Sequence, residues 1–219
     1  MLPLQLITSR HNSHFKRFGA LAPGGELSFN QRVGERTFAR GFRPAKELAN
    51  RRLVDGIGGG VCQVAGTLHA AAFLAGFEIP VHQPHSRPVS YIPMGLDTMV
   101  SWPNRDLRIR NPYPFPIRIT AETDGQSVRV ALYGAGKPHP VDWDKAVVER
   151  VPGGMQEVTD PALAPGESQL VQRASDGLLI ERTRTVYLPT GPAEQVRKLR
   201  YPPTPQITAL GPEPITNDP

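Results

Sequence analysis

The sequence predicts an α+β fold in which one central helix packs on antiparallel strands and a small all-β extension follows. Apolar residues recur at helical spacing from Val61 to Ala75. Farther along, strand-like runs at 117–120 and 127–133 flank Asp124-Gly125, a dipeptide typical of tight hairpin turns. The 24 Pro and 21 Gly residues among 219 favour short elements and exclude a bundle of long helices.

The part of the chain before the central helix is expected to consist of short elements separated by turns. Residues 2–7 should form a strand, 22–25 a turn and 27–30 an extended segment. A helix is expected over residues 44–50, because the proline at its start occupies a first-turn position where a missing N–H costs nothing. The glycine-rich run 56–60 should then force irregular backbone.

The central helix should begin at Val61 and end near Gly76, since glycine is favoured just after a helix C-terminus. The proline-rich stretch that follows is expected to hold two short strands, at 89–92 and 107–110. Beyond it, extended segments are expected at 168–173, 178–187 and 194–201.

The chain is predicted to divide into a domain at 1–136, a linker at 137–154 and a β extension at 155–219 that ends in a Pro-rich segment. Charge is distributed unevenly between the parts. Residues 1–136 hold 16 Lys and Arg against 9 Asp and Glu, whereas residues 137–219 hold 9 against 11. The cationic first part therefore indicates an anionic partner.

Several classes of protein are excluded by composition. A single Cys excludes an intramolecular disulfide framework and any multi-Cys zinc or iron–sulfur site. The longest apolar stretch, 68–81, contains His69 and Glu78, so it is too short and too polar to span a membrane. The start of the chain shows no signal peptide.

Nucleotides and nucleic acids are not expected ligands. Val61 stands where a dinucleotide-binding GxGxxG pattern from Gly56 needs glycine, and the GK[ST] of a phosphate loop is absent. The basic run 32–52 is interrupted by Glu35 and Glu47 and carries few aromatic residues. No cofactor is therefore predicted.

Cys62 is the first candidate for chemistry. It follows three glycines and opens the central helix, where free N–H groups and a partial positive charge stabilise a thiolate. The backbone near Gly59 and Gly60 could also hold an oxyanion. This order of glycine turn, nucleophile and helix suits acyl transfer. The alternative is a buried structural cysteine.

A thiol nucleophile needs a base, and His82 and His85 lie in a rigid, proline-flanked loop. His69 lies two helical turns after Cys62, about 10 Å away, which favours a supporting role. Asp97 could orient an imidazole, as in a catalytic triad, or cap a turn. Arg87 could bind a substrate carboxylate through two hydrogen bonds or remain solvated.

A metal site is the weaker interpretation of the histidines. Two HxxH pairs occur, one at His11 and His14 and the other at His82 and His85, and Cys62 could join them in a mixed zinc site. Neither pair lies in a convincing helix, and Pro84 interrupts the second. No metal is therefore predicted.

Four stretches in order, covering residues 9–134, resemble the VanW family. The opening stretch is Pro23-Gly24-Gly25-Glu26-Leu27-Ser28-Phe29-Asn30, then Val33-Gly34-Glu35-Arg36-Thr37, Gly41-Phe42 and Ala45. The central one is Gly58-Gly59-Gly60-Val61-Cys62-Gln63-Val64 with Thr67-Leu68. The histidine loop is His85-Ser86-Arg87-Pro88-Val89-Ser90-Tyr91-Ile92-Pro93-Met94-Gly95-Leu96-Asp97, and closing strands follow at 111–134.

The resemblance has two departures and a second, looser part. Ala65-Gly66 stand where the family usually has two hydroxyl residues, and Thr98-Met99 stand where it prefers Ala-Thr. Residues 155–212 resemble a G5-like β-module, which often follows VanW domains and is thought to bind envelope saccharides.

The resemblance implies a bacterial cell-envelope protein that acts as a cysteine L,D-transpeptidase on peptidoglycan stem peptides. Cys62 would be the nucleophile, with His85 and Asp97 as its catalytic partners. Substrate would contact the loop residues, namely Arg87, Ser86, His82 and Tyr91. The expected partner is peptidoglycan or an anionic wall polymer, and the expected location is extracytoplasmic. The alternative is a non-catalytic envelope module that binds wall polymer or a protein partner.

Overall fold

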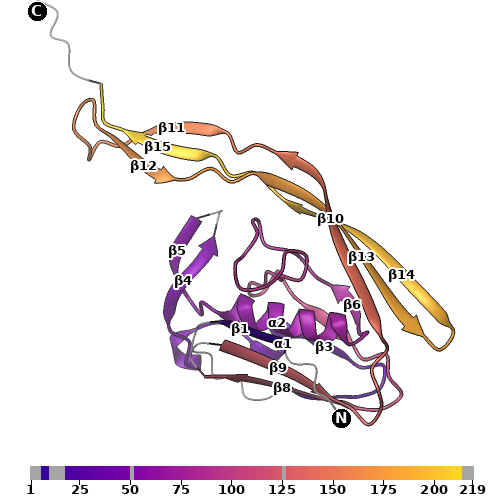
Figure 1. The fold of residues 1–219 in the computed structure, drawn as a ribbon. Helices are drawn as coiled ribbons and strands as arrows, with labels where there is room; N and C mark the ends of the chain where they lie inside the picture. Colours follow the sequence, from indigo (N-terminus) through magenta and orange to yellow (C-terminus); the bar gives the residue numbers. More distant parts are fainter. Residues whose placement is uncertain (1–5, 10–17, 50–51, 125–126, 214–219) are drawn as a thin grey trace, which may run out of the picture.

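The computed structural model describes residues 6–9, 18–49, 52–124 and 127–213 (Figure 1). Within these residues the protein is mostly β, and the expected α+β fold is wrong. The described residues hold fifteen strands but only two α-helices, one of which is five residues long. The balance differs from expectation because the C-terminal part forms strands of up to twelve residues.

The first part of the chain contains nine strands and all of the described helices. The strands are β1 (Leu6–Ser9), β2 (Gly19–Leu21), β3 (Glu26–Ser28), β4 (Pro44–Ala49), β5 (Arg52–Ile57), β6 (Glu78–Val81), β7 (Arg108–Arg110), β8 (Ile117–Thr123) and β9 (Ser127–Tyr133). The helices are α1 (Phe29–Val33), a 3-10 turn (Phe38–Arg40) and α2 (Val61–Leu74). They form sheets with the strand orders β1-β9-β8-β2, β3-β7-β6 and β4-β5.

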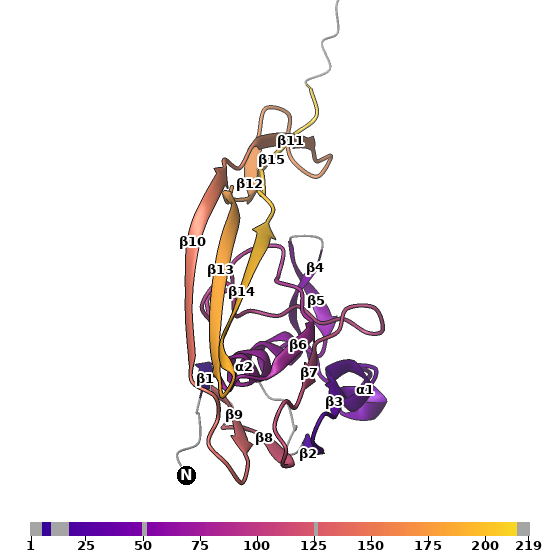
Figure 2. The same cartoon turned by 90° about the vertical axis from the view of Figure 1, so that its right-hand side faces the viewer.

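The main core lies between α2 and the four-stranded sheet. Burial alternates along β8, where Ile117, Ile119 and Ala121 point inward, as expected for a strand with one covered face. Leu68 of α2 is fully buried against this face. Almost every residue of α2 is buried, because other segments cover the helix on its remaining sides (Figure 2).

Some local predictions are confirmed and others are wrong. The helix begins at Val61, and the predicted hairpin is formed by β8 and β9, which pair antiparallel. The expected helix at 44–50 is wrong where it is described: Pro44–Ala49 is β4, because it pairs with β5 along its full length. Residues 89–92 form no strand, and 90–92 are bends.

The C-terminal extension is an elongated arm of two three-stranded sheets placed end to end (Figure 1). Its strands are β10 (Val141–Val151), β11 (Met155–Thr159), β12 (Ser168–Gln172), β13 (Gly177–Leu188), β14 (Gly191–Tyr201) and β15 (Gln206–Leu210). They pair in the orders β10-β13-β14 and β11-β15-β12. The stretch expected to be a linker, 137–154, thus contains an edge strand of the arm.

The β10-β13-β14 sheet runs alongside the first part of the chain and packs against α2 (Figure 2). Trp143 of β10 meets the ring of Phe73 edge to face, with 6.1 Å between centroids. Arg184 of β13 donates hydrogen bonds to the carbonyl oxygens of Phe73 and Phe77, at 2.6 and 3.0 Å. The first bond adds a donor to the Phe73 carbonyl oxygen in the last turn of α2, which also accepts from the Gly76 N–H at 3.3 Å. The second satisfies the Phe77 carbonyl oxygen just beyond the helix.

No helix in the described residues has the length and apolar character needed to cross a membrane.

Candidate active site

Cys62 is the second residue of α2. Gly60 occupies the N-cap in left-handed backbone (φ +94°), a conformation that glycine adopts without a steric cost. The thiol is partly buried and donates a hydrogen bond to the carbonyl oxygen of Val100, with 3.4 Å between Sγ and O. Because N–H groups in a first helical turn lack helical partners, the backbone here favours negative charge.

The long loop between β6 and β7 brings His85 and Asp97 together, and both side chains are buried. Asp97 Oδ2 accepts a hydrogen bond from the His85 backbone N–H at 2.7 Å and lies 3.0 Å from Nδ1 of the His85 ring. Asp97 Oδ1 accepts from the Tyr201 hydroxyl at 2.6 Å and from the Gly95 N–H at 3.3 Å. The carboxylate is therefore fixed from both sides and orients the imidazole, as a triad requires.

The surroundings favour the charged forms of His85 and Asp97. Burial by itself lowers the pKa of His85, but side-chain hydrogen bonds to Asp97 and Cys62, together with their charges, raise it to about 9. Burial by itself raises the pKa of Asp97, but hydrogen bonds from His85 and Tyr201 hold it below its ordinary value. Because Nδ1 of His85 faces Asp97, Nε2 is the ring nitrogen that is available to Cys62. The structure thus brings the three predicted catalytic residues into one series.

Tyr91 lies beside this series. Its hydroxyl oxygen is 3.5 Å from Nε2 of His85, and the two rings meet edge to face. Burial and the charges of Cys62 and Asp97 raise the pKa of Tyr91 well above its ordinary value, so the phenol stays protonated. Tyr91 can therefore exchange a hydrogen bond with the imidazole or with a bound substrate.

The other predicted substrate-binding residues follow His85 directly. Ser86 and Arg87 are both partly exposed. Among the described residues Arg87 takes part in no ion pair, and its binding of a substrate carboxylate stays a prediction. Gly59 and Gly60 lie just before α2, within one helical turn of Cys62.

His82 has a different environment from the one expected of a second base. Its Nε2 lies 2.7 Å from the Asp97 carbonyl oxygen, and its ring stacks on His69 with 4.1 Å between centroids. His69 Nδ1 in turn lies 2.8 Å from the carbonyl oxygen of Leu96. Burial lowers the pKa of His82 to about 4 and also lowers that of His69. The stacked, neutral rings therefore support the loop that carries Asp97.

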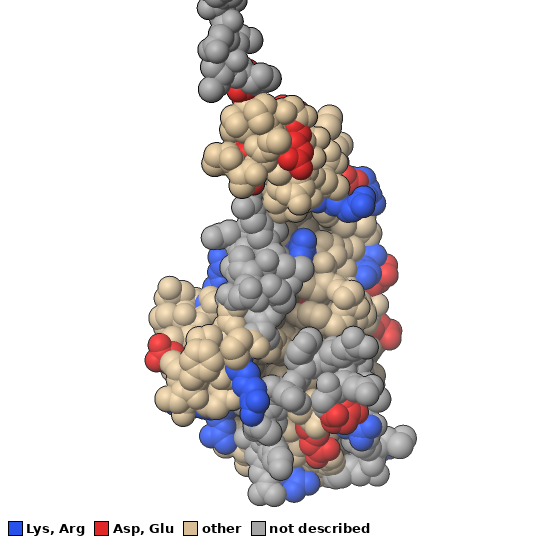
Figure 3. Space-filling model, turned by 90° about the vertical axis from the view of Figure 1, so that its left-hand side faces the viewer, with Lys and Arg blue, Asp and Glu red and all other residues tan. Residues whose placement is uncertain are grey.

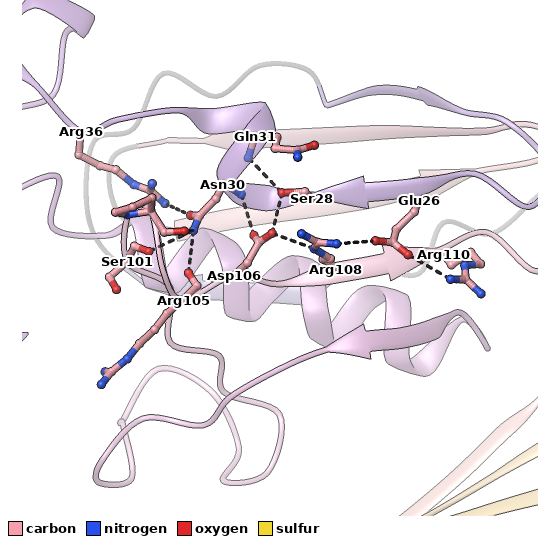
Figure 4. A network of polar contacts seen from close by, with 11 residues as sticks. Glu26, Ser28, Asn30, Gln31, Arg36, Ser101, Arg105, Asp106, Arg108 and Arg110 are labelled. Carbon is pink, nitrogen blue, oxygen red and sulfur yellow. Dashed lines mark hydrogen bonds and ion pairs between the residues drawn. The ribbon is translucent and has the colours of Figure 1, made fainter.

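Arg36 is a candidate residue that sequence reasoning did not single out. Its Nη2 donates to Asn30 Oδ1 at 2.7 Å (Figure 4). Its Nη1 donates to the Gly34 carbonyl oxygen at 2.9 Å. Burial lowers the pKa of Arg36, and the electrostatic attraction of Cys62 and Asp106 opposes this shift. Arg36 is therefore a preoriented cation that lies against Gly58, just before α2, although the sequence marks it only as one residue of a longer resembling stretch.

The network around Arg36 is built by backbone as well as side chains (Figure 4). Asn30 Nδ2 donates to the carbonyl oxygens of Ser101 and Arg105, at 3.0 and 2.8 Å. Asp106 accepts from the Asn30 N–H at 2.8 Å and from the Ser28 hydroxyl at 2.6 Å. The β3–α1 segment is thereby joined to the loop before β7, which fixes Arg36 at the site.

No metal centre is evident in the described part of the chain. The described residues contain no group of three or more His, Cys, Asp or Glu side chains that could hold a metal ion. His11 and His14 lie outside the described residues. On the face drawn in Figure 3, the described Lys and Arg side chains are scattered among Asp and Glu.

Residues 18–133 match the family model described as VanW like protein. The match spans more than half of the chain, which therefore belongs to the VanW family. A similar protein is the "Uncharacterized protein YoaR" of Bacillus subtilis (strain 168), which is 42% identical over 113 residues. That alignment covers 52% of this chain and 37% of YoaR, so the chain spans well under half of the relative's length. Family membership suggests a protein of the cell envelope.

The histidine pKa values predict a stability maximum near pH 6.5. The folded-state pKa of His85, about 9, exceeds the unfolded value, so its contribution is complete below pH 6.5 and is lost as pH rises toward 9. The pKa of His82, about 4, is depressed, so its contribution is complete above pH 6.5 and is lost as pH falls toward 4. The alkaline and the acid limb of this pH profile should each lower the free energy of unfolding by on the order of 3 kcal/mol.

Urea unfolding followed by circular dichroism from pH 4 to 9 measures both limbs. His85→Gln should flatten the alkaline limb alone. His82→Gln should reduce the acid limb alone, to which His69 also contributes because burial lowers its pKa too. A free energy of unfolding that stays constant across this range would contradict the prediction.

Proposed function

We propose that the protein is a cysteine-dependent acyltransferase of the L,D-transpeptidase type that acts on peptidoglycan stem peptides. The observation that carries the proposal is the series Cys62, His85 and Asp97, in which a buried carboxylate orients an imidazole beside a thiol at a helix N-terminus. This arrangement provides a nucleophile, a proton carrier and an orienting group.

The reaction would proceed through a thioester. The thiolate of Cys62 attacks the carbonyl carbon before the terminal D-residue, and N–H groups near Gly59 and Gly60 stabilise the oxyanion. The tetrahedral intermediate collapses with cleavage of the peptide C–N bond, and the leaving amine takes a proton from His85. The amine of a second stem then attacks the thioester and gives its proton to His85, and Cys62 leaves as a thiolate. With water as acceptor, the same steps give a carboxypeptidase.

A non-catalytic envelope module is the second candidate. The observation that favours it is the Cys62 thiol itself, which donates to Val100 and packs against the main core like a small apolar residue. In this case the site residues would serve architecture, and the protein would bind wall polymer or a protein partner through its surface.

Incubation with disaccharide-tetrapeptide muropeptides, followed by mass spectrometry, tests the proposal. The expected products lack the terminal D-residue and include cross-linked dimers, and prior alkylation of the protein by iodoacetamide should stop both. Loss of the residue without dimers would indicate a carboxypeptidase. Unchanged muropeptides of several stem types, on folded protein, would favour the binding module.

Arg36 is expected to bind the terminal carboxylate of the stem. Hydrogen bonds to Asn30 and Gly34 hold its guanidinium group in place, which suits a planar contact with a carboxylate through two hydrogen bonds. Arg36→Gln should raise KM for a free-carboxylate stem by about 10- to 100-fold. The matched variant Arg87→Gln tests the arginine that the sequence favours for this role. With an amidated stem the KM difference between wild type and Arg36→Gln should vanish, and a difference that persists would contradict carboxylate binding.

A further inference from the structure

The arm contributes an uncommonly polar face to its contact with the first domain. Buried positions alternate along β13, as expected for a strand that packs through one face, and they include Ile180, Arg182 and Arg184. On β14, Leu199 and Tyr201 are buried beside them, and Tyr201 is only 1% exposed. A hydroxyl and two guanidinium groups are therefore buried where the arm meets the first domain, and each requires a partner there.

The partner of the Tyr201 hydroxyl is the site itself. The hydroxyl donates to Asp97 Oδ1 at 2.6 Å and accepts from the Gly95 N–H at 2.9 Å. Burial and the charge of Asp97 raise the pKa of Tyr201 well above its ordinary value, so the phenol remains a donor. The hydroxyl contacts Oδ1 of Asp97, whereas the backbone N–H and the ring Nδ1 of His85 both contact Oδ2.

The arm also fixes the backbone that carries Asp97. Arg182 Nη1 donates to the Gly95 carbonyl oxygen, and Lys145 Nζ donates to the Met94 carbonyl oxygen at 3.2 Å. Gly95 has φ +93°, a left-handed backbone that favours glycine, and a Cβ there would lie 3.2 Å from Ile180 Cδ1 of β13. On the other side, the stacked rings of His82 and His69 contact the same loop.

We infer that Tyr201 is a positioning residue that extends the series to Tyr201, Asp97, His85 and Cys62, so that the arm completes the active site. This inference rests on the proposed function of Cys62 as a nucleophile. The Tyr201 hydroxyl fixes the rotation of the Asp97 carboxylate, and Arg182 fixes its loop. An Asp97 released from Tyr201 would turn away from His85 for part of the time and stabilise the imidazolium less.

The test is the pH dependence of Cys62 alkylation by iodoacetamide on the full chain. Because Cys62 is the single cysteine, labelling reports this thiol alone. Tyr201→Phe should lower the rate of alkylation near pH 6 about tenfold. In an Asp97→Asn background, Tyr201→Phe should cause no further change in alkylation, because Tyr201 acts through Asp97.

Two matched variants separate positioning from general damage to the arm. Tyr187 of β13 is exposed and also donates to a carboxylate, that of Asp142 at 2.8 Å, so Tyr187→Phe should leave the profile unchanged. Leu199→Ala removes buried packing from β14 without touching a hydrogen bond to Asp97, so it should lower the melting temperature but not the alkylation rate of the folded protein. If Tyr201→Phe does not fold, Arg182→Lys loosens the same loop and should also lower the alkylation rate near pH 6.

The outcomes distinguish this inference from the proposed function. If wild-type Cys62 reacts no faster than a free thiol, the nucleophile proposal fails, and the inference fails with it. If wild type reacts fast near pH 6 and folded Tyr201→Phe has the same profile, only the positioning role is overturned.

Discussion

Replacing Cys62 by alanine is expected to abolish release of the terminal D-residue and formation of dimers, with a loss in rate of about four orders of magnitude or more. No other thiol in the chain can take over, because Cys62 is the single cysteine. The fold should persist, since the change removes one partly buried sulfur atom and its weak hydrogen bond to Val100. The expected change in the free energy of unfolding is about 1 kcal/mol.

Mass spectrometry of muropeptides, beside a circular dichroism melt, measures both effects. Cys62→Ser is the matched variant because it keeps the shape and a hydrogen-bond donor but lacks a thiol, and it should be inactive as well. If Cys62→Ala retained wild-type product yields, the acyl-transfer mechanism would be wrong. If Cys62→Ala loses much stability and the wild-type protein is itself inactive, Cys62 has a structural role.

Replacing Asp97 by asparagine should damage both turnover and stability. The carboxylate accepts hydrogen bonds on both oxygens, from His85 on Oδ2 and from Tyr201 and Gly95 on Oδ1. In either orientation the amide of asparagine would place an NH2 group against buried donors. We expect turnover to fall by about 10³- to 10⁴-fold and the free energy of unfolding to fall by about 3 kcal/mol or more.

Turnover per folded molecule, with urea unfolding to measure stability, separates the two effects. Asp176→Asn is a control, because Asp176 also accepts from a cation and a backbone N–H, those of Arg150 and Gly153, but lies in the arm and is exposed. It should leave the iodoacetamide profile of Cys62 unchanged. An Asp97→Asn protein that turns over like wild type would show that His85 needs no carboxylate.

The features that the sequence could predict are those with local signals. The α2 helix has its apolar repeat, and the β8–β9 hairpin has its Asp-Gly turn, so both could be found without tertiary information. Cys62, His85 and Asp97 could be proposed together from their residue types and loop setting. Their contact, however, depends on a loop that runs between β6 and β7 and returns to the start of α2.

The features that escaped prediction depend on contacts between distant segments. Residues 44–49 form a strand because β5 pairs with them, which overrides the helix signal of a leading proline. In β13 the alternation places Arg182 and Arg184 on the buried face, where sequence rules expect apolar residues. Tyr201 lies 104 residues after Asp97, and no spacing rule joins two such positions.

The docking of β13 on α2 also bears on how the protein can be divided. The region recognised by homology ends at residue 133, but Arg184, which donates to the Phe73 and Phe77 carbonyl oxygens, lies beyond it. A fragment cut at the homology boundary would leave the Phe73 and Phe77 carbonyl groups without these donors and would expose the Phe73 ring to water. The smallest stable fragment of this chain should therefore be longer than the stretch by which its relatives are recognised.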